Sequence, residues 1–365
     1  GGDPEWDFKD AAKGNINPYP GDWGANDLIG GGSIFSLIAV DESTGIIYFP
    51  TGAPALSYDA SLRPGPNLYA NSIVALDANT GKMIWYHQTT PHDINGHEPA
   101  RSLILANATV NGEERKVILS STKGDYAYVF DAATGELLHD PISFGAQKIS
   151  AYNTNQGNNA DMNLSQDVLE GREYCPGAFG GAASTSAFAD NTFFVATQNY
   201  CSQFNVGKVP YKDKLINGFQ IEPSLIGQSS SVHAIDVSTG QIKWTFPMES
   251  RYQGGVTVSG GVVYLVDLSG NFYALDSETG DVLKQIPMNG AGNTGVTIAS
   301  DANGDMRLYI ATGGSKSGII TALGLPETLT TEDEGISRRG LIGSIALTSI
   351  VGLLYLAFLR FYRKN

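Results

Sequence analysis

Three of the five histidines in the chain, His87, His92 and His97, follow one another at intervals of five residues. Imidazole is a good ligand for zinc and copper, so three clustered histidines would be a candidate transition-metal site. An odd spacing along a strand, however, places side chains on opposite faces. His87 also lies in strand-like sequence, whereas His92 lies in a turn. We therefore expect surface or loop histidines here, with a metal site as the alternative.

Other residues point to an exported protein. Cys175 and Cys201 are the only cysteines, and an even pair in an exported domain favours a disulfide over two buried free thiols. Sequons beginning at Asn107 and Asn163 are candidate glycosylation sites, although such triplets also occur by chance. The sequence starts at Gly1 without an initiator Met, so an exported body would carry its signal peptide in a precursor.

The C-terminus reads as a membrane anchor. Residues 340–359 are 20 residues without a charge, and a helix of that length spans about 30 Å, the thickness of the bilayer hydrocarbon. Basic residues flank this segment on both sides: Arg338, Arg339, Arg360, Arg363 and Lys364. Their distribution favours a single-pass protein of the cell membrane with an extracytoplasmic body and a cytoplasmic C-terminus. A buried core helix is the alternative.

Composition narrows the class of protein. Only 16% of the residues are charged, below the roughly 25% of typical globular chains, which argues against a disordered polyelectrolyte or a coiled coil. Residues 338–365 hold five of the 23 basic residues and none of the 37 acidic ones, which leaves 18 basic against 37 acidic residues, a net charge of −19, on residues 1–337. This charge excludes nucleic acid as a default partner and could attract a cationic cytochrome.

One motif recurs along the body: an apolar strand ends in Asp, and after two further residues comes Thr-Gly. The five copies begin at Asp41, Asp77, Asp131, Asp236 and Asp276. The Asp side chain can accept backbone N–H bonds while Gly takes a positive φ, so each copy predicts a hairpin turn. Four-stranded units repeating every 40–45 residues or so are typical of a β-propeller. A β-sandwich with fortuitous turns is the alternative.

The copies are 36, 54, 105 and 40 residues apart. We expect the interval of 105 residues to contain at least one blade without the motif, and residues 151–167 to form a long loop. In two copies a tryptophan follows the glycine, at Trp85 and Trp244.

This Ala-x-Asp-x-x-Thr-Gly-x-x-x-Trp repeat resembles the tryptophan-docking motif of quinoprotein alcohol dehydrogenases. Longer segments extend the resemblance: residues 63–69, 72–77, 88–93, 123–131 and 175–181. That family consists of eight-bladed propellers that hold pyrroloquinoline quinone (PQQ) and a Ca²⁺ or lanthanide ion on the central axis. The resemblance covers about residues 30–322. It implies an all-β propeller of this type, with about five or six blades supplied by this chain, plus one C-terminal transmembrane α-helix.

The domain boundaries follow from these two inferences. Residues 1–30 are an N-terminal extension or ring-closing segment, and residues 31–325 are the blades. Residues 326–339 are a linker, 340–359 the transmembrane helix and 360–365 a basic cytoplasmic tail. Because an open propeller exposes strand edges, we expect a segment of the precursor or a partner chain to complete the ring.

The resemblance also assigns the family's working positions. Its metal-binding Asn falls on Ala53, so a methyl group replaces a ligand oxygen. Its catalytic Asp falls on Gly96, and glycine cannot abstract a proton. Its basic residue at the quinone is matched by Lys123, the Trp beneath the quinone by Phe35, and a polar Asn by Ala183. The resemblance further implies a structural disulfide between Cys175 and Cys201.

Two functions remain open. A degenerate propeller would be a structural or docking subunit of a membrane complex and would hold no cofactor. Alternatively, Asp93, Asn95 and Glu98 rebuild an oxygen site for the metal, and Glu98 or Asp93 is the base of a PQQ- and metal-dependent alcohol or aldehyde dehydrogenase that passes electrons to a cytochrome or the membrane chain. A blade-assembly factor that binds other membrane proteins ranks third.

Overall fold

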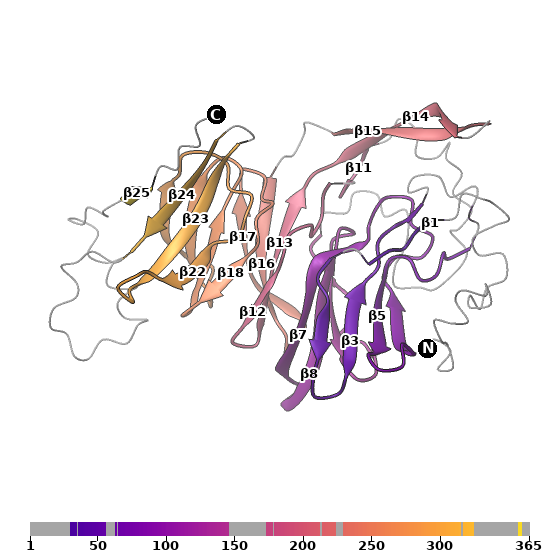
Figure 1. Ribbon diagram of the computed structural model, residues 1–365, viewed down its shortest axis with the longest axis horizontal. Coiled ribbons are helices and arrows are strands. Elements are labelled where there is room, and N and C mark those ends of the chain that lie inside the picture. Colours follow the sequence, from indigo (N-terminus) through magenta and orange to yellow (C-terminus); the bar gives the residue numbers. More distant parts are fainter. Residues whose placement is uncertain are drawn as a thin grey trace. The chain divides into compact units, whose positions relative to one another are not determined.

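The computed structural model describes residues 30–34, 36–55, 63, 65–145, 173–177, 179–211, 214–223, 229–314, 317–324 and 357–359. Within these residues every regular element is a β-strand (Figure 1), which confirms the all-β prediction for this part of the chain. The chain divides into two compact units. One holds residues 1–183, 197–228 and 236–241, and the other holds residues 184–196, 229–235 and 242–365.

The first unit contains two antiparallel four-stranded sheets, which we call blades 1 and 2. Blade 1 has the order β2-β3-β5-β6, with strands β2 (Ala39–Asp41), β3 (Ile46–Pro50), β5 (Ser72–Asp77) and β6 (Met83–Gln88). Blade 2 has the order β10-β9-β8-β7, with strands β7 (Pro99–Val110), β8 (Glu113–Thr122), β9 (Tyr126–Asp131) and β10 (Ile142–Ser143). Strands β1 (Gly30–Gly31) and β4 (Pro54–Ala55) form a separate pair.

Three further four-stranded sheets follow along the chain. Blade 3 consists of β12 (Ala187–Ala189), β13 (Thr192–Asn199), β16 (Ser229–Asp236) and β17 (Gln241–Met248). Blade 4 consists of β18 (Thr257–Ser259), β19 (Val262–Val266), β20 (Asn271–Asp276) and β21 (Val282–Pro287). Blade 5 consists of β22 (Thr297–Ser300), β23 (Met306–Gly314), β24 (Ser317–Leu323) and β25 (Ala357–Leu359). Each blade is antiparallel and follows the chain from one edge to the other.

Among the described residues between Asp131 and Asp236, no four-stranded sheet lies between blades 2 and 3. Instead, a three-stranded sheet of β11 (Glu173–Tyr174), β14 (Ser202–Tyr211) and β15 (Lys214–Pro223) occupies part of the interval. Strands β14 and β15 form a long hairpin (Figure 1) that is inserted between β13 and β16 of blade 3. An insertion inside one blade therefore lengthens the spacing without adding a blade. The predicted loop at 151–167 lies outside the described residues.

The Asp-Gly turns form as the motif predicts. In each copy the Asp Oδ1 accepts the backbone N–H two residues on, at distances of 2.8 to 3.1 Å. The glycine N–H donates to the Asp carbonyl oxygen at 2.8 to 2.9 Å, and its φ lies between 69° and 77°. Because only glycine takes this φ without strain, the motif fixes the turn.

The first copy of the motif differs from the others in its position. Asp41 ends β2, so its turn joins the first two strands of blade 1, whereas Asp77, Asp131, Asp236 and Asp276 each end the third strand of a blade. Asp41 and Asp77 therefore belong to the same blade, which accounts for their spacing of 36 residues.

The turns also join neighbouring blades. Trp85 Nε1 donates to the Ala132 carbonyl oxygen at 2.9 Å, and Trp244 Nε1 donates to the Ser277 carbonyl oxygen at 3.1 Å. Both rings cover the glycine of the receiving turn: a Cβ at Gly135 would lie 2.5 Å from Trp85. The glycine is therefore required for space as well as for its φ.

A histidine takes the same place in blade 2. His139 lies four residues after Gly135, as Trp85 and Trp244 lie four residues after their own glycines. Its Nε2 lies 2.8 Å from the Val237 carbonyl oxygen, and a Cβ at Gly240 would lie 2.6 Å from its ring. The same contact is thus made by an imidazole ring in place of an indole ring.

Apolar side chains fill the space between the docked blades. Tyr48, Ile73 and Trp85 of blade 1 pack with Ile118 and Phe130 of blade 2, and all five side chains are buried. The third strand of blade 1, β5, is buried at five consecutive positions because it carries apolar side chains on both faces. The core therefore lies on both faces of the sheet.

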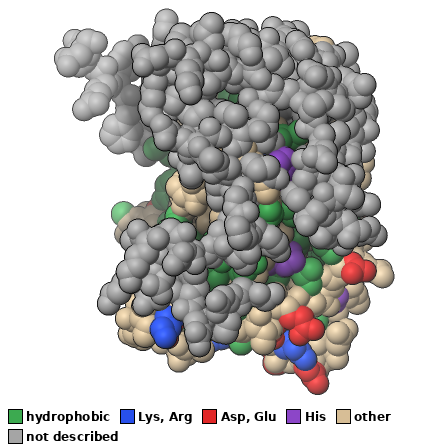
Figure 2. Space-filling model, turned by 90° about the vertical axis from the view of Figure 1, so that its right-hand side faces the viewer, with side chains coloured by type: hydrophobic (Ala, Val, Ile, Leu, Met, Phe, Trp, Pro, Cys, Tyr) green, Lys and Arg blue, Asp and Glu red, His purple; other side chains and the backbone are tan. Residues whose placement is uncertain are grey.

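His87 belongs to the same part of the molecule as this core. Its ring centroid lies 5.0 Å from that of Phe130 and 5.9 Å from that of Tyr128. On the face shown in Figure 2, histidine side chains lie among hydrophobic ones. Burial lowers the pKa of His87 from 6.5 to about 4, because charging the ring there would cost solvation. The expectation of a surface histidine is thus wrong for His87.

The predicted membrane helix is not confirmed. Of residues 340–359 the structure describes only Ala357–Leu359, which form β25 and pair with Ile320, Thr321 and Ala322 of β24. Within the described part of the chain, no helix has the length and apolar character needed to cross a membrane. The predicted linker and tail lie outside the described residues, as do all but the last residue of the segment 1–30.

We predict that Trp85→Ala lowers the free energy of unfolding by about 3–5 kcal/mol, because it removes a buried ring from the contact between two blades. Trp85→Phe is the matched control. It keeps most of the packing and loses one hydrogen bond, at a cost of about 1 kcal/mol. The Ala132 carbonyl oxygen keeps a partner, because the Tyr48 hydroxyl also donates to it. Urea unfolding distinguishes the two; equal losses would contradict a packing role.

We also predict an acid-dependent loss of stability. His87 is protonated more easily in the unfolded chain, with a pKa of 6.5, than in the folded protein, with a pKa of about 4. Stability should therefore be unaffected above pH 6.5 and should fall as the pH drops towards 4. At pH 4.5 this histidine should account for about 2–3 kcal/mol.

The variant His87→Phe tests the assignment. Relative to the wild type, its urea midpoint should shift less between pH 7 and pH 4.5. His233, whose pKa burial also lowers to about 4, remains in the variant, so part of the acid effect should persist. An unchanged pH dependence in His87→Phe would exclude His87 as a cause.

Candidate functional site

Three segments of the first unit meet around Lys123. The first is the loop 93–98, the second is the turn 122–125 between β8 and β9, and the third is the segment 175–183. Backbone hydrogen bonds join them: the Lys123 N–H donates to the Glu98 carbonyl oxygen at 3.2 Å, and the Ala182 N–H donates to the Thr122 carbonyl oxygen at 3.2 Å. The sequence positions assigned from the resemblance are therefore partly brought together.

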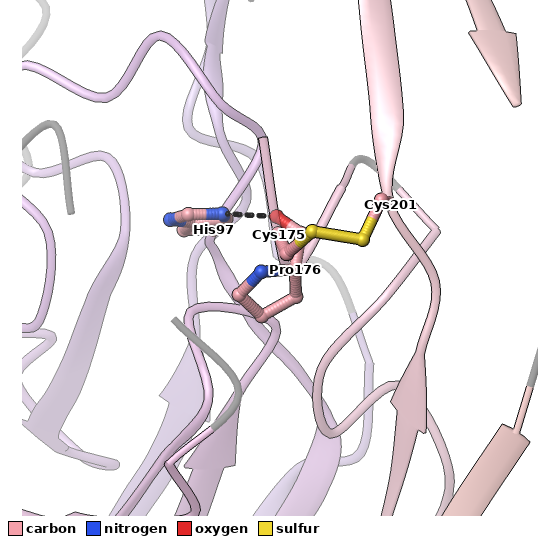
Figure 3. Close-up of a disulfide and its surroundings, with 4 residues drawn as sticks. All are labelled: His97, Cys175, Pro176 and Cys201. Carbon is pink, nitrogen blue, oxygen red and sulfur yellow. Dashed lines mark hydrogen bonds between the residues drawn. A yellow bond between two sulfur atoms is a disulfide. The ribbon is translucent and has the colours of Figure 1, made fainter. Parts of the chain in front are cut away.

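The predicted disulfide between Cys175 and Cys201 is confirmed (Figure 3). It links the start of the third segment to the residue before β14, and the Gly177 N–H donates to the Tyr200 carbonyl oxygen. Held in this way, the Pro176 carbonyl oxygen points at His97 Nε2 and lies 3.0 Å from it. The disulfide thus fixes the segment that contacts the loop 93–98.

Asp93 is fully engaged within its own loop. Its Oδ1 accepts the N–H groups of Asn95 at 2.8 Å and of Gly96 at 3.1 Å. Its Oδ2 accepts the His97 N–H at 2.9 Å and the Asn71 side-chain amide at 2.8 Å. The side chain is 1% exposed. With four donors on two oxygens and no access to water, this carboxylate orders the loop.

Two residues that the sequence analysis did not assign support this loop. Asn71 donates to the Asp93 carboxylate, and Arg63, which is buried, donates to the Asp93 carbonyl oxygen and to the Asn67 side chain. Arg63 begins the Arg-Pro-Gly segment that carried the resemblance. A buried arginine needs hydrogen-bond acceptors nearby. This need could have indicated that Arg63 supports a neighbouring loop.

Glu98 and Lys123 form a buried ion pair. Lys123 Nζ donates to Glu98 Oε1 at 2.9 Å, and the two side chains are 8% (Glu98) and 14% (Lys123) exposed. The other carboxylate oxygen, Glu98 Oε2, is buried and has no hydrogen-bond partner among the residues that the structure describes. Removing either charge alone would leave the other buried and unpaired, which is strongly unfavourable.

The remaining predicted positions supply few oxygen atoms. Asn95 is buried, and its Oδ1 has no partner. Gly96 has a φ of 73° and presents no side chain at the family's base position. The Ala53 side chain is a methyl group, and its carbonyl oxygen accepts the Gly32 N–H at 3.1 Å.

This donor set does not fit a Ca²⁺ or lanthanide ion. A hard cation of this type takes about six to eight oxygen ligands. Asp93 is already saturated and Glu98 faces an ammonium group, which leaves Glu98 Oε2 and Asn95 Oδ1. The described residues contain no group of three or more His, Cys, Asp or Glu side chains placed to hold a metal.

The other predicted site residues contribute less. Phe35 and Asn163 lie outside the described residues. Ala183 donates its N–H to the Gly181 carbonyl oxygen and has no polar side chain to replace the family's Asn. Asn107 is exposed on β7, an orientation that is compatible with a sequon.

The three clustered histidines go to different partners. His87 packs against aromatic rings, His92 Nδ1 lies 2.7 Å from the Gly65 carbonyl oxygen, and His97 contacts Pro176. His92 and His97 are 2% and 8% exposed. Both are loop residues, as expected, although their side chains are buried.

Comparisons with known proteins agree with the fold. Residues 1–143 match the family model for the glucose/ethanol/alcohol dehydrogenase β-propeller domain. Residues 228–323 match the model for the outer membrane protein assembly factor BamB. The two models together cover blades 1 and 2 and most of blades 3 to 5.

Two bacterial dehydrogenases are among the relatives. The putative dehydrogenase XoxF of Paracoccus denitrificans is 30% identical over 288 residues, which are 71% of this chain and 46% of the relative. The lanthanide-dependent methanol dehydrogenase of Methylorubrum extorquens is 27% identical over 270 residues, which are 66% of this chain and 43% of the relative. The chain thus spans less than half the length of either relative.

Solved structures match the same fold. The quinohemoprotein alcohol dehydrogenase of Comamonas testosteroni aligns with a TM-score of 0.67 and 23% identity, over 86% of this chain and 49% of the other. A europium-containing methanol dehydrogenase aligns with a TM-score of 0.64 and 20% identity, over 86% of this chain and 56% of the other. Together with the docked Asp-Gly turns and the sequence relatives, these matches establish that the chain belongs to the PQQ-dependent alcohol dehydrogenase-like β-propellers.

Proposed function

We propose that this chain is a degenerate quinoprotein-type propeller and serves as a structural or docking subunit of a membrane complex. One observation carries this proposal: the family's base position is Gly96, and the nearby Asp93 cannot replace the base because four hydrogen bonds hold its carboxylate. The missing ligand oxygen at Ala53 adds to it. The relatives' names describe their own activities, and this chain spans only part of their length.

The ion pair between Glu98 and Lys123 supports the same proposal. In the family, the basic residue at the position of Lys123 contacts the quinone. Here its ammonium neutralises the buried Glu98 carboxylate. The two charged groups that alcohol oxidation would use therefore neutralise each other. The loop arrangement requires both charges, because removing one of them would leave the other buried and unpaired.

A specific observation favours a second candidate, a PQQ-dependent alcohol or aldehyde dehydrogenase. Glu98 Oε2 and Asn95 Oδ1 are buried without partners, which costs about 1–3 kcal/mol for each group, and such atoms are often explained by a missing water or ligand. In this alternative Glu98 Oε2 takes the hydroxyl proton of the alcohol and Asn95 Oδ1 orients the substrate, while Lys123 holds Glu98 in place through Oε1. Bound quinone would supply the hydride acceptor.

Cofactor content and one variant separate the two candidates. For a structural subunit, the protein purified from its own membranes should contain no stoichiometric quinone, Ca or lanthanide and should not reduce a dye with alcohol or aldehyde. For an enzyme, Glu98→Gln should reduce kcat by about 10²- to 10⁴-fold, as expected for the loss of a general base. The control is Glu136→Gln, which changes an exposed carboxylate and should have no effect. Bound quinone together with a Glu98-dependent activity would overturn the structural proposal.

We further propose that residues 340–359 anchor the protein in the cell membrane, with the body on the extracytoplasmic face and the C-terminus in the cytoplasm. The length of the uncharged segment and its basic flanks support this. Full-length protein should remain with membranes after an alkaline wash, whereas a truncation after residue 337 should be released. Leu353→Arg should weaken retention, since a charge at the centre of the span is costly. Release of the full-length protein would contradict the anchor.

The net charge of −19 on residues 1–337 supports a cationic partner such as a small cytochrome, because long-range attraction speeds such encounters. On the face in Figure 2, however, acidic and basic side chains of the described residues lie next to one another. The proposal therefore rests on the total charge. Partner binding should weaken as ionic strength rises.

A further inference from the structure

We infer that strand β15 (Lys214–Pro223) is a self-pairing edge, at which two copies of this chain associate through an antiparallel β15–β15 contact centred on Gly218. The inference goes beyond the proposed structural role, because it names one interaction surface and its partner. It involves none of Asp93, Asn95, Glu98 or Lys123, so it can hold or fail independently of whether the chain oxidises alcohols.

Strand β15 forms one edge of its sheet. The sheet has the order β11-β14-β15 (Figure 1), and β14 pairs with β15 from Ser202 opposite Pro223 to Tyr211 opposite Lys214. Within the part of the chain that the structure describes, no strand pairs with the other side of β15. An edge of ten residues presents a row of backbone N–H and C=O groups to which a further strand can add.

The register of the hairpin decides which backbone groups of β15 are directed away from β14. Because Tyr211 pairs with Lys214, two residues connect the strands, and the pair that closes such a hairpin is hydrogen-bonded. Hydrogen-bonded and non-hydrogen-bonded pairs alternate along an antiparallel ladder, so the even-numbered residues of β15 bond to β14. The N–H and C=O groups of Leu215, Asn217, Phe219 and Ile221 are therefore directed to the open side.

The sequence of β15 is complementary to itself about Gly218. An antiparallel pairing centred there places Lys214 opposite Glu222 of the second copy, once at each end of the contact, and Leu215 opposite Ile221 of the second copy. Opposite charges and large aliphatic residues at facing positions stabilise an antiparallel pair. Moving the centre by one residue in either direction would separate the two charges. The charge pattern therefore selects this register and a second copy as the partner.

The same register brings the open backbone groups together. It places Asn217 opposite Phe219 of the second copy and Leu215 opposite Ile221, so the residues with open N–H and C=O groups face one another. Gly218 and the charged pair fall at non-hydrogen-bonded positions, where facing side chains are closest. Because identical strands use the same surface on both copies, the contact is isologous and ends at a dimer.

The pairing also continues an apolar row across the contact. In the hairpin, Phe204 pairs with Ile221 and Val206 pairs with Phe219, and the alternation of the strands puts these four positions on one face. Leu215 of the second copy has a register position on that face, next to Ile221. Association therefore joins the apolar faces of two hairpins into one.

Charge reversal tests the contact in full-length protein purified in a mild detergent. Lys214→Glu and Glu222→Lys should each raise the Kd of the dimer about ten-fold, because each variant creates two pairs of like charges. The double variant should restore the affinity. Within one copy the two positions lie eight residues apart on an extended strand, roughly 27 Å, so only a contact between copies allows this rescue.

Sedimentation equilibrium measures the Kd, and Lys284→Glu is the matched control because it makes the same charge change at an exposed position of β21. The control should leave the Kd unchanged. A protein that stays monomeric at all concentrations would overturn the inference. Single variants with an unchanged Kd, or a double variant that stays weak, would also overturn it.

Disulfide trapping provides a second measurement of the register. In the variant Gly218→Cys the two thiols face each other across the axis, where the Cα atoms of a non-hydrogen-bonded pair lie about 4.5 Å apart, a separation that suits a disulfide. Gln220→Cys is the control on the same face, because its counterpart in the second copy lies roughly 14 Å away. Mild oxidation should link the first variant at least ten-fold faster. Equal rates, or no link at position 218, would overturn the inference.

Discussion

The architecture depends on one contact, in which a ring lies against the glycine of a turn and donates an N–H to a carbonyl oxygen of that turn. Trp85 and Trp244 make this contact with indole and His139 makes it with imidazole. The receiving turn works because an Asp side chain satisfies its N–H groups internally, which leaves the carbonyl oxygen available. In blades 1, 2 and 3 a donor ring thus follows the Asp-Gly turn by four residues.

The sequence predicted the turns well because their information is local. Asp, Thr and Gly at fixed offsets determine the hydrogen bonds and the positive φ without reference to any distant residue. The disulfide was also predicted, because the chain has only two cysteines and they can pair within the chain in only one way. The motif alone did not show that Asp41 and Asp77 lie in one blade, because the same turn chemistry serves any hairpin. Spacing alone also does not distinguish an inserted hairpin such as β14–β15 from a new sheet.

The site was harder to predict because its properties come from burial and from distant partners. Asp93 looks like a free acid in sequence, but four donors, including the distant Asn71, bind it. Lys123 and Glu98 are 25 residues apart and pair only because the turn 122–125 folds over the loop 93–98. His139 was overlooked as a docking residue because the motif was defined by tryptophan, whereas its physical requirement is a flat ring with an N–H.

The same division explains how the proposed degenerate propeller would keep its fold without the family's catalytic residues. Docking uses backbone carbonyls, glycines and rings at the turns, and none of these groups belongs to the loop 93–98. Gly96 adopts a φ of 73°, a left-handed conformation that glycine takes without steric cost, so glycine at the family's base position is compatible with this loop. Loss of a docking ring, in contrast, opens a contact between blades, and selection for folding alone would keep Trp85, His139 and Trp244 while the site changed.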